Sequence, residues 1–263
     1  MARYCPLFSG SSGNCSYIGS GEGGLLIDAG VSAKRIETAL RDRAIEPSSI
    51  RAIFVTHEHS DHIAGLRVLV KRYGFPVFAS RGTLQELLRM GALKEGDPFA
   101  VVDEEGIEVA GMEVFAFPTP HDSLESLGYR IHTPDGRRIG VATDIGFFAP
   151  VIQQALRGCD LVQIESNHDV RMLENGPYPY YLKKRILAKT GHLSNDACAC
   201  ELPELVRQGT TRVYLSHLSA ENNTPDLAYV TAQAALLEAG MRENTDFLLQ
   251  VAERVGTKDV IKF

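Results

Sequence analysis

The sequence predicts a layered α/β protein in which sheets are covered by helices. Short apolar runs rich in β-branched and aromatic residues alternate with helical patterns along the whole chain. No repeat, low-complexity tract or long linker interrupts this alternation. With 263 residues, 44% of them hydrophobic and 23% charged, the chain has enough material for a large core. We therefore predict a single domain spanning residues 1–263.

The expected strands are short apolar runs bounded by turn residues. In chain order they are Tyr4–Phe8, Ser16–Ile18, Leu25–Asp28, Ile53–Thr56, Val77–Ala79, Met112–Phe117, Gly128–His132, Ile139–Ala142, Leu161–Ile164, Val213–Ser216 and Phe247–Val251. Several of these runs end directly in a histidine or an aspartate, which places ionisable groups at strand ends.

The expected helices show apolar residues at helical spacing behind capping residues. They are Ala33–Arg43 behind a Ser32 cap, Asp61–Arg72, Thr83–Met90, Pro150–Leu156, Asn195–Arg207 behind a Ser194 cap, and Asp226–Glu238. Gly91 and Gly240 stand where two of these helices should stop.

Composition limits the location and the partners. No apolar run approaches the length that crosses a bilayer, and the first residues lack a signal-peptide core, so we expect a cytoplasmic protein without a membrane partner. Five scattered cysteines argue against a disulfide framework. The net charge of −6 at first argues against nucleic acid, but two divalent ions would add +4 and leave −2. The sequence indicates no oligomeric state.

A short apolar strand runs directly into a cluster of ionisable side chains in the stretch AIFVTHEHSDH. His57 and His59 lie two apart in an extended segment, so both rings point the same way, and Asp61 and His62 open the next helix. Crowding these groups costs desolvation and repulsion unless a cation binds them. Two neighbouring ions accommodate four ligands from so short a segment better than one tetrahedral ion does. The alternative is a solvated polar loop, but turns favour Asn, Gly and Ser.

Three more residues of metal-binding type follow other predicted strands. His121 follows the strand in FAFPTPHD, Asp144 ends IGVATD, and His217 follows the strand in VYLSHLS. Each alone is more often a cap or a surface group. Together with HxHxDH they predict a two-metal site, in which the two oxygens of Asp144 are able to bridge both cations.

This ordered set of motifs resembles the metallo-β-lactamase superfamily over essentially the whole chain. The resemblance implies a four-layer αββα sandwich with a di-metal site along one edge of the sheets, and the intact HxHxDH favours hydrolysis. It implies that Asp28, at the end of GGLLIDAG, supports the histidine loop without binding metal. It also implies the ligand sets, with His57, His59 and His121 on one metal, Asp61, His62 and His217 on the other, and Asp144 bridging.

Four further stretches, LFSGSSGNCSYI, ESNHD, TGHLSND and SHLSAENN, resemble the branch of bacterial exonucleases known as YycJ, WalJ or VicX. This resemblance implies phosphodiester hydrolysis of DNA, from a 5′ end or on single strands, with RNA as an alternative substrate. The loop SGSSGN lacks the Lys-Ser/Thr of a Walker sequence and is expected to form a turn that lines the site.

The expected mechanism uses a metal-bridging hydroxide that attacks phosphorus in line. Zn²⁺ or Mn²⁺, with Fe²⁺ as a further candidate, suits the nitrogen and oxygen ligands. Asp61 is expected to orient the nucleophile or to accept its proton. His192 and His168 are the candidate donors to the leaving oxygen, and His192 is also expected to contact phosphate beside the start of a helix. A loop histidine bonded to backbone is the alternative for His192.

Substrate contacts are expected from two segments. Asn167 or His168 either reaches the substrate or simply belongs to a helix start near Asp169, with Asn167 as its cap. The segment YPYYLKKR places Tyr181 beside Lys183, Lys184 and Arg185, so that an aromatic face stacks unpaired bases while cations follow phosphates. An amphipathic helix with solvated charges is the plain alternative and does not exclude phosphate binding.

Two other functions compete with a DNA exonuclease. One is a small-molecule hydrolase of the same fold, such as a cyclic phosphodiesterase or a thioesterase. The other is a metal-stabilised regulatory protein that binds nucleic acid without cutting it. The complete ligand set argues against the second, because structural zinc sites are usually closed by four ligands.

Overall fold

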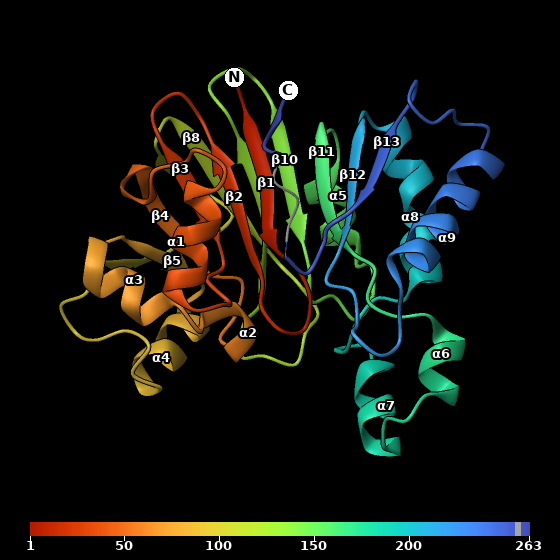
Figure 1. Cartoon of the computed structure of the whole chain (residues 1–263), viewed down its shortest axis with the longest axis horizontal. Helices are drawn as coiled ribbons and strands as arrows, with labels where there is room; N and C mark the ends of the chain where they lie inside the picture. The colour runs from red at the N-terminus through yellow and green to blue at the C-terminus, as the bar shows by residue number, and fades with distance from the viewer. Residues whose placement is uncertain (256–258) are drawn as a thin grey trace. The chain divides into compact units, whose positions relative to one another are not determined.

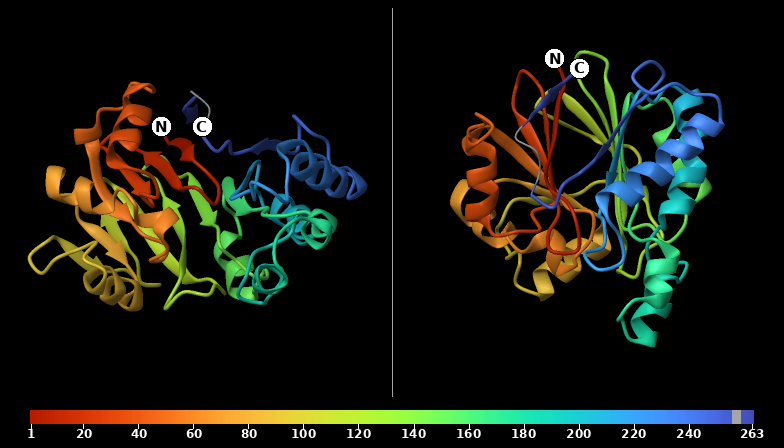
Figure 2. Two further views of the ribbon diagram at one scale, coloured as in Figure 1. Left: turned by 60° about the horizontal axis from the view of Figure 1, so that its bottom comes forward. Right: turned by 45° about the vertical axis from the view of Figure 1, so that its right-hand side comes forward.

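A computed structural model describes residues 1–255 and 259–263 of the chain. The chain comprises two compact units (Figures 1 and 2). The first consists of Met1–Ala116, Ser123–Arg137 and Glu253–Phe263, and the second of Phe117–Asp122 and Arg138–Ala252. The expectation of one domain over residues 1–263 stays a prediction beside this division.

The first unit contains a seven-stranded mixed sheet of order β14-β1-β2-β3-β4-β5-β6. Its strands are β1 (Arg3–Phe8), β2 (Cys15–Gly19), β3 (Gly24–Ile27), β4 (Ile50–Phe54), β5 (Val77–Ala79), β6 (Phe99–Val101) and β14 (Ile261–Lys262). Strands β1 to β3 pair antiparallel, whereas β3 to β6 pair parallel. The parallel register of Ile27 with Phe54 brings the ends of β3 and β4 together, where Asp28 and the histidine loop begin.

In the part of the chain that the structure describes, four helices and one 3₁₀ turn belong to the first unit (Figure 1). They are α1 (Ala33–Arg41), α2 (Ser60–Ile63), α3 (Leu66–Tyr73), α4 (Arg81–Arg89) and the 3₁₀ turn Pro47–Ser49. Their apolar faces bury Ile36, Leu40, Leu66, Leu69 and Leu87 against the sheet, in one core cluster with the inward side chains of β3, β4 and β5. The alternation of strands and helices in the sequence thus yields a helix-covered sheet, as predicted.

The second seven-stranded sheet is also mixed and has the order β13-β12-β11-β10-β9-β8-β7. Its strands are β7 (Ile107–Val109), β8 (Met112–Pro118), β9 (Leu127–His132), β10 (Arg138–Ala142), β11 (Leu161–Glu165), β12 (Arg212–Ser216) and β13 (Leu248–Val251). Strands β10 to β13 run parallel. Parallel strands end at one edge, so the residues after β10, β11 and β12 meet there.

In the second unit, α5 (Pro150–Leu156), α8 (Asn195–Arg207) and α9 (Pro225–Glu238) pack on β10 to β13 around a core that includes Ile152, Val162, Leu202, Leu215 and Leu236. Two short helices, α6 (Val170–Asn175) and α7 (Tyr180–Ile186), lie beyond the ends of β11 and β12 (Figures 1 and 2). They form a projection that carries the aromatic and basic segment.

One predicted helix is broken. The expected helix Asp61–Arg72 is instead α2 and α3, separated at Gly65. The apolar spacing through Ile63, Leu66 and Leu69 runs across the break and hides it. The cause is tertiary, because Gly65 N donates to Ala29 O at 2.8 Å, outside the helix. The segment after β3 lies so close that a Cβ at Gly65 would be 2.3 Å from the carbonyl oxygen of Val31.

Helix ends follow the predictions in part. Gly91 and Gly240 follow α4 and α9 with φ of 74° and 81°, as expected of glycines after a helix. Ser194 caps α8 by accepting a hydrogen bond from Ala197 N. Ser32 was expected to cap α1, but its side chain makes no such bond.

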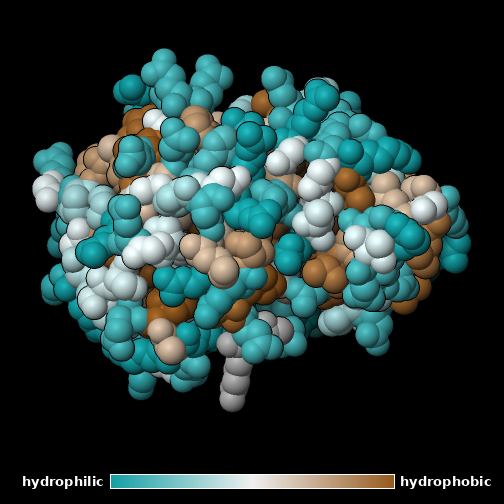
Figure 3. All heavy atoms as spheres, turned by 90° about the horizontal axis from the view of Figure 1, so that it is seen from above, coloured by the Kyte–Doolittle hydropathy of each residue, from teal (hydrophilic) through white to brown (hydrophobic). Residues whose placement is uncertain are grey.

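Strands β6, β7 and β14 and the 3₁₀ turn were not predicted. Among the described residues, no helix combines the length and apolarity that crossing a membrane requires. On the face shown in Figure 3, hydrophilic side chains predominate and apolar atoms form small, separate patches.

Candidate metal centre

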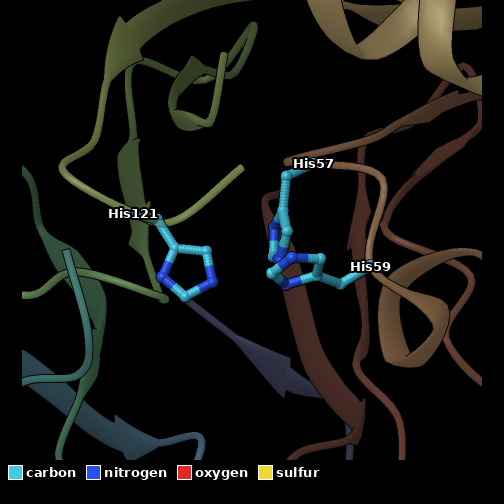
Figure 4. A group of neighbouring side chains, drawn as sticks. All are labelled: His57, His59 and His121. Carbon is cyan, nitrogen blue, oxygen red and sulfur yellow. The ribbon is translucent and has the colours of Figure 1, made fainter. Parts of the chain in front are cut away.

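The loop after β4 carries four of the predicted ligands. His57 and His62 are buried, and their ring centroids lie 4.0 Å apart. The rings of His57 and His59 are 4.5 Å apart and edge to face, so both lie on one side of the loop, as their spacing predicted. Figure 4 shows these two rings on that loop and His121 on the segment after β8. His62 Nε2 lies 3.5 Å from Asp61 Oδ2.

Asp28 fixes this loop from the end of β3. Its Oδ2 is 2.7 Å from His62 Nδ1, and its Oδ1 accepts a hydrogen bond from Thr56 N at 2.8 Å. A carboxylate only accepts, so we assign the Nδ1 proton to His62, which leaves the Nε2 lone pair for a cation. Burial raises the pKa of Asp28, and the contacts of His62 and Thr56 oppose that rise. These contacts are what a supporting role requires, while the role itself stays a prediction.

The backbone of the motif DAG and Asn14 hold the same loop. A Cβ at Gly30 would lie 1.6 Å from the carbonyl oxygen of Asp61, so only glycine fits there. Asn14 N donates to that oxygen at 2.8 Å, and Asn14 Nδ2 donates to His62 Nε2 at 3.1 Å, a hydrogen bond that a cation at Nε2 would replace. The loop SGSSGN, which ends in Asn14, therefore touches the candidate metal ligands directly. The sequence suggested the loop but not this residue.

In the second unit, the parallel strand ends bring together Asp144, after β10, and His217, after β12. Both residues have left-handed backbones, with φ of 55° and 57°, as does Asp28 with 63°. Such conformations cost a non-glycine residue about 1–2 kcal/mol and cluster at functional sites. Here each left-handed residue directs an ionisable side chain from a strand end.

His121 joins the same cluster. Its Nε2 lies 3.7 Å from Asp144 Oδ1, and its Nδ1 lies 3.2 Å from the carbonyl oxygen of Gly191. Because a carbonyl accepts, Nδ1 carries the proton and Nε2 is left as the ligand atom. Burial lowers the pKa of His121, so the ring is neutral near pH 7 and suited to a cation.

Glu165 was missed from the sequence, although it organises this half of the site. It ends β11 and is fully buried. Its Oε1 accepts from Nδ1 of both His192 and His217 at 2.8 Å, while its Oε2 accepts from Ile145 N at 2.8 Å and Leu193 N at 3.2 Å. Burial alone would raise the pKa of Glu165, but the two histidines hold it well below its ordinary value.

The strand-end rule that identified Asp144 and His217 could also have identified Glu165. It pairs in register with Ser216, the residue before His217. The predicted strand stopped one residue early, at Ile164, and ESNHD served only as a point of resemblance.

His192 and His168 occupy different environments. The side chain of His192 is 18% exposed, and Glu165 fixes its Nδ1. Burial lowers the pKa of His192 but Glu165 raises it more, so the net shift is upward. His168 is buried, neither ring nitrogen has a hydrogen-bond partner among the described residues, and burial lowers its pKa to about 4.

The helix-start prediction near these residues needs correction. Asp169, not Asn167, caps α6, by accepting from Met172 N. The buried Asn167 amide donates to the carbonyl oxygen of His217, so it holds a candidate ligand instead of reaching outward. At α8, Asn195 N already donates to His168 O, which weakens the anion site expected beside His192.

The aromatic and basic residues lie on α7. Tyr181 is 74% exposed, and Lys184 lies over the ring of Tyr180 at 5.3 Å. Lys183 Nζ donates to Glu174 O, and Arg185 makes two hydrogen bonds to Asp122, next to His121. The charge of Arg185 is thus already paired. The expected contacts with substrate stay predictions for Arg185 and for the other six candidates, Asn167, His168, His192, Tyr181, Lys183 and Lys184.

Each unit therefore presents a donor set suited to divalent cations. The first offers His57, His59, Asp61 and His62, and the second offers His121, Asp144, His192 and His217, with Glu165 holding the last two through Nδ1. In the second, one ligand atom each from Asp144, Glu165, His192 and His217 lie within 4.8 Å of one another. Buried imidazoles held through Nδ1 by a carboxylate or a carbonyl are the arrangement that metal-binding histidines require.

Comparison with known proteins assigns the family. Residues 24–218 match the family model described as the beta-lactamase superfamily domain. The chain belongs to the β-lactamase superfamily. It is 35% identical to exodeoxyribonuclease YycJ of Bacillus anthracis, over 90% of each chain. It is 34% identical to exodeoxyribonuclease WalJ of Streptococcus pneumoniae, over 93% of this chain and 92% of that protein.

Among solved structures, the metallo-β-lactamase fold protein YhfI from Bacillus subtilis superposes with a TM-score of 0.73 at 14% identity, covering 97% of this chain and 98% of that one. At that identity the likeness concerns the fold alone. The metallo-β-lactamase fold, with two mixed sheets flanked by helices, is therefore confirmed. The resemblance to the YycJ and WalJ branch, read from the sequence motifs, is confirmed as well.

Proposed function

We propose that this protein is a metal-dependent phosphodiesterase that degrades DNA from a 5′ end towards the 3′ end. The observation that carries the proposal is its 34–35% identity, over nine-tenths of the chain, to two proteins named exodeoxyribonucleases. The donor sets of both units supply the residue types that such a hydrolase needs. We also propose that it acts in the cytoplasm, on the sequence grounds given above.

In this proposal the protein binds two divalent cations. His57, His59 and His121 would hold one, Asp61, His62 and His217 the other, and Asp144 would bridge them. Imidazole and carboxylate ligands suit Zn²⁺, Mn²⁺ and Fe²⁺ alike, and metal supply decides among them. Glu165 is a poor ligand candidate, because hydrogen bonds from two imidazoles and two backbone N–H groups already occupy both its oxygens.

When bound, two cations supply charge neutralisation on the phosphate and a water of lowered pKa. The chain contributes the remaining steps. Asp61, partly exposed beside His62, orients the attacking water and takes its proton. His192 donates a proton from Nε2 to the leaving sugar oxygen, because Glu165 holds its Nδ1 and its ring is within reach of solvent. His168 is buried and neutral, so it suits a hydrogen bond to substrate better than proton donation.

The substrate is proposed to be single-stranded DNA or a 5′ end, with RNA as an alternative. Tyr181 and Lys184 of α7 are exposed and offer a stacking face and a phosphate contact. Arg185, paired with Asp122, ties α7 to the His121 segment instead of extending freely to a phosphate. We propose that α7 guides the strand while Asp122 and Arg185 hold its orientation.

A degradation time course tests the proposal. One 5′-phosphorylated single-stranded oligonucleotide is labelled at its 5′ end and another at its 3′ end, and each is incubated with Mn²⁺ or Zn²⁺. We expect early mononucleotide release from the 5′ label and a shortening ladder from the 3′ label. Asp144→Asn should be inactive, whereas the exposed Glu104→Gln, the matched acid-to-amide control, should match wild type.

Other outcomes separate the alternatives. A ladder from the 5′ label would reverse the proposed direction, and preferred degradation of an RNA oligonucleotide would change the substrate. Turnover of a cyclic dinucleotide or a thioester, with no turnover of DNA, would indicate a small-molecule hydrolase. Binding of DNA without cleavage under every metal tested would indicate a regulatory binding protein.

A further inference from the structure

Three segments of the second unit contact one another at Gly146: its own segment, the segment of Pro120 and the segment of Lys189 to Gly191. A Cβ at Gly146 would lie 2.2 Å from the carbonyl oxygen of Lys189 and 2.7 Å from Gly191 N, so these backbones touch. Gly146 N also donates to Pro120 O at 2.9 Å. Gly146 thus contacts both the segment that contains His121 and the segment that contains His192.

Phe147 follows directly after Gly146. Its side chain is 43% exposed, whereas its neighbour Phe148 packs on the core of the second unit. Isolated exposed apolar residues are normal and need no explanation. Phe147 differs from other exposed apolar residues because its backbone is held in place by the contacts of the preceding Gly146. Asp144 lies three residues before it. An exposed aromatic ring on a rigid backbone, next to three candidate site residues, is a ready contact surface for a ligand.

The segment that contacts Gly146 carries a lysine, which favours an anionic ligand. Lys189, whose carbonyl touches residue 146, is exposed and makes no ion pair among the described residues, and Thr190 beside it is exposed too. His192 N donates to Ile186 O, and Gly191 packs against the end of α7. The segment Lys189 to His192 therefore contacts the basic helix α7 directly. An exposed aromatic face together with the exposed Lys189 suits an unpaired nucleotide better than a lipid or an apolar peptide.

We propose that Phe147 is a base-stacking subsite for a nucleotide of a single strand, with Lys189 on an adjacent phosphate. This inference rests on the proposed nuclease function and deepens it, because it names an unpaired base as the recognised group. Phe147 would hold the strand close to Asp144, His121 and His192 without taking part in bond cleavage. The subsite is sequence-tolerant, since every base offers a π face.

Binding measured without cleavage tests the subsite. Fluorescence anisotropy of a 5′-phosphorylated single-stranded oligonucleotide, with EDTA present so that no chain is cut, gives the dissociation constant. We expect Phe147→Ala to weaken binding by about 5- to 100-fold, because losing one base–aromatic stack costs that much. Phe147→Tyr keeps the ring and should bind within about twofold of wild type. Leu237→Ala, which truncates an exposed apolar residue on α9, should change nothing.

Abasic substitution locates the stacked base. A single abasic position is moved along the oligonucleotide, and we expect one position to weaken wild-type binding as strongly as Phe147→Ala does. In Phe147→Ala that position should lose its effect, which demonstrates direct coupling. An unchanged dissociation constant, or the same abasic profile in both proteins, would overturn the subsite. If wild type degrades DNA in the time course and either result is found, the subsite fails while the nuclease function stands.

Discussion

Replacing Glu165 with glutamine tests the structure's central polar contact with almost no change of shape. Glu165 accepts four hydrogen bonds, from Nδ1 of His192 and His217 and from the N–H groups of Ile145 and Leu193. An amide has one accepting oxygen and one donating NH₂ group. Whichever way the new side-chain amide turns, its NH₂ group therefore faces two donors.

The expected loss in the free energy of unfolding follows from the number of hydrogen bonds that glutamine cannot accept. Two buried hydrogen bonds are lost, at about 1–3 kcal/mol each, so the free energy of unfolding should fall by about 2–6 kcal/mol. For a protein of this size that corresponds to a loss of about 5–20 °C in Tm. If His217 instead moves its proton to Nε2 and accepts from the amide, it loses the lone pair that a cation needs. Metal affinity should then fall about 10- to 100-fold.

The stability lost in Glu165→Gln should depend on pH in a defined direction. Glu165 has a lowered pKa, so its stabilisation is present above its unfolded pKa of about 4.3 and disappears as the pH falls through the folded value. His192 has a raised pKa, so its stabilisation is present below about pH 6.5 and disappears as the pH rises through the folded value. In metal-free protein the difference between wild type and variant should therefore peak between about pH 4.3 and 6.5.

Thermal denaturation across pH 4 to 8 in EDTA, together with metal content after dialysis against Zn²⁺ or Mn²⁺, measures both effects. Glu104→Gln, an exposed acid-to-amide control, should stay within about 0.5 kcal/mol of wild type. A Glu165→Gln protein with wild-type Tm near pH 5.5 and wild-type metal content would refute the reasoning about this carboxylate.

Three further predictions follow from the first unit and from α7. Gly30→Ala should destabilise the protein by more than about 3 kcal/mol and lower its metal content, because the new Cβ meets the Asp61 carbonyl, whereas Gly21→Ala, with nothing within 4 Å, should be neutral by denaturation. Thr56→Val should cost about 1–3 kcal/mol by leaving Asp28 short of hydrogen bonds, and the exposed Thr38→Val serves as its control. Lys184→Ala should reduce the salt slope of DNA binding by about one, against no change for Lys71→Ala; an unchanged slope would exclude α7 from the phosphate path.

The sequence predicted most strands and the main helices because their signals are local. An apolar run that ends in an ionisable residue identified Asp144 and His217, and the HxHxDH spacing placed His57 and His59 on one side of their loop. The break at Gly65 escaped prediction because its cause, the hydrogen bond from Gly65 N to Ala29 O, is a tertiary contact.

The polar contacts of the second unit escaped prediction for a similar reason. The contact between Arg185 and Asp122 joins residues 63 apart in the chain, and no local pattern reports it. Glu165 had a local signal, at the end of an apolar run, but its importance lies in the two histidines that it binds. Sequence patterns thus identify candidate ligands more readily than the residues that orient them.

The orienting residues explain why the candidate ligands sit on strained backbone. Asp28, which supports the histidine loop, and the candidate ligands Asp144 and His217 each adopt a positive φ at a strand end, at a cost of about 1–2 kcal/mol. At Asp28 and His217 the hydrogen bonds are short and buried, namely Thr56 N to Asp28 and His217 to Glu165. These bonds fix side-chain directions within each unit before any cation binds, so cation binding should need little rearrangement there. The strain is therefore best understood as the cost of holding ligand atoms in fixed directions at the ends of strands.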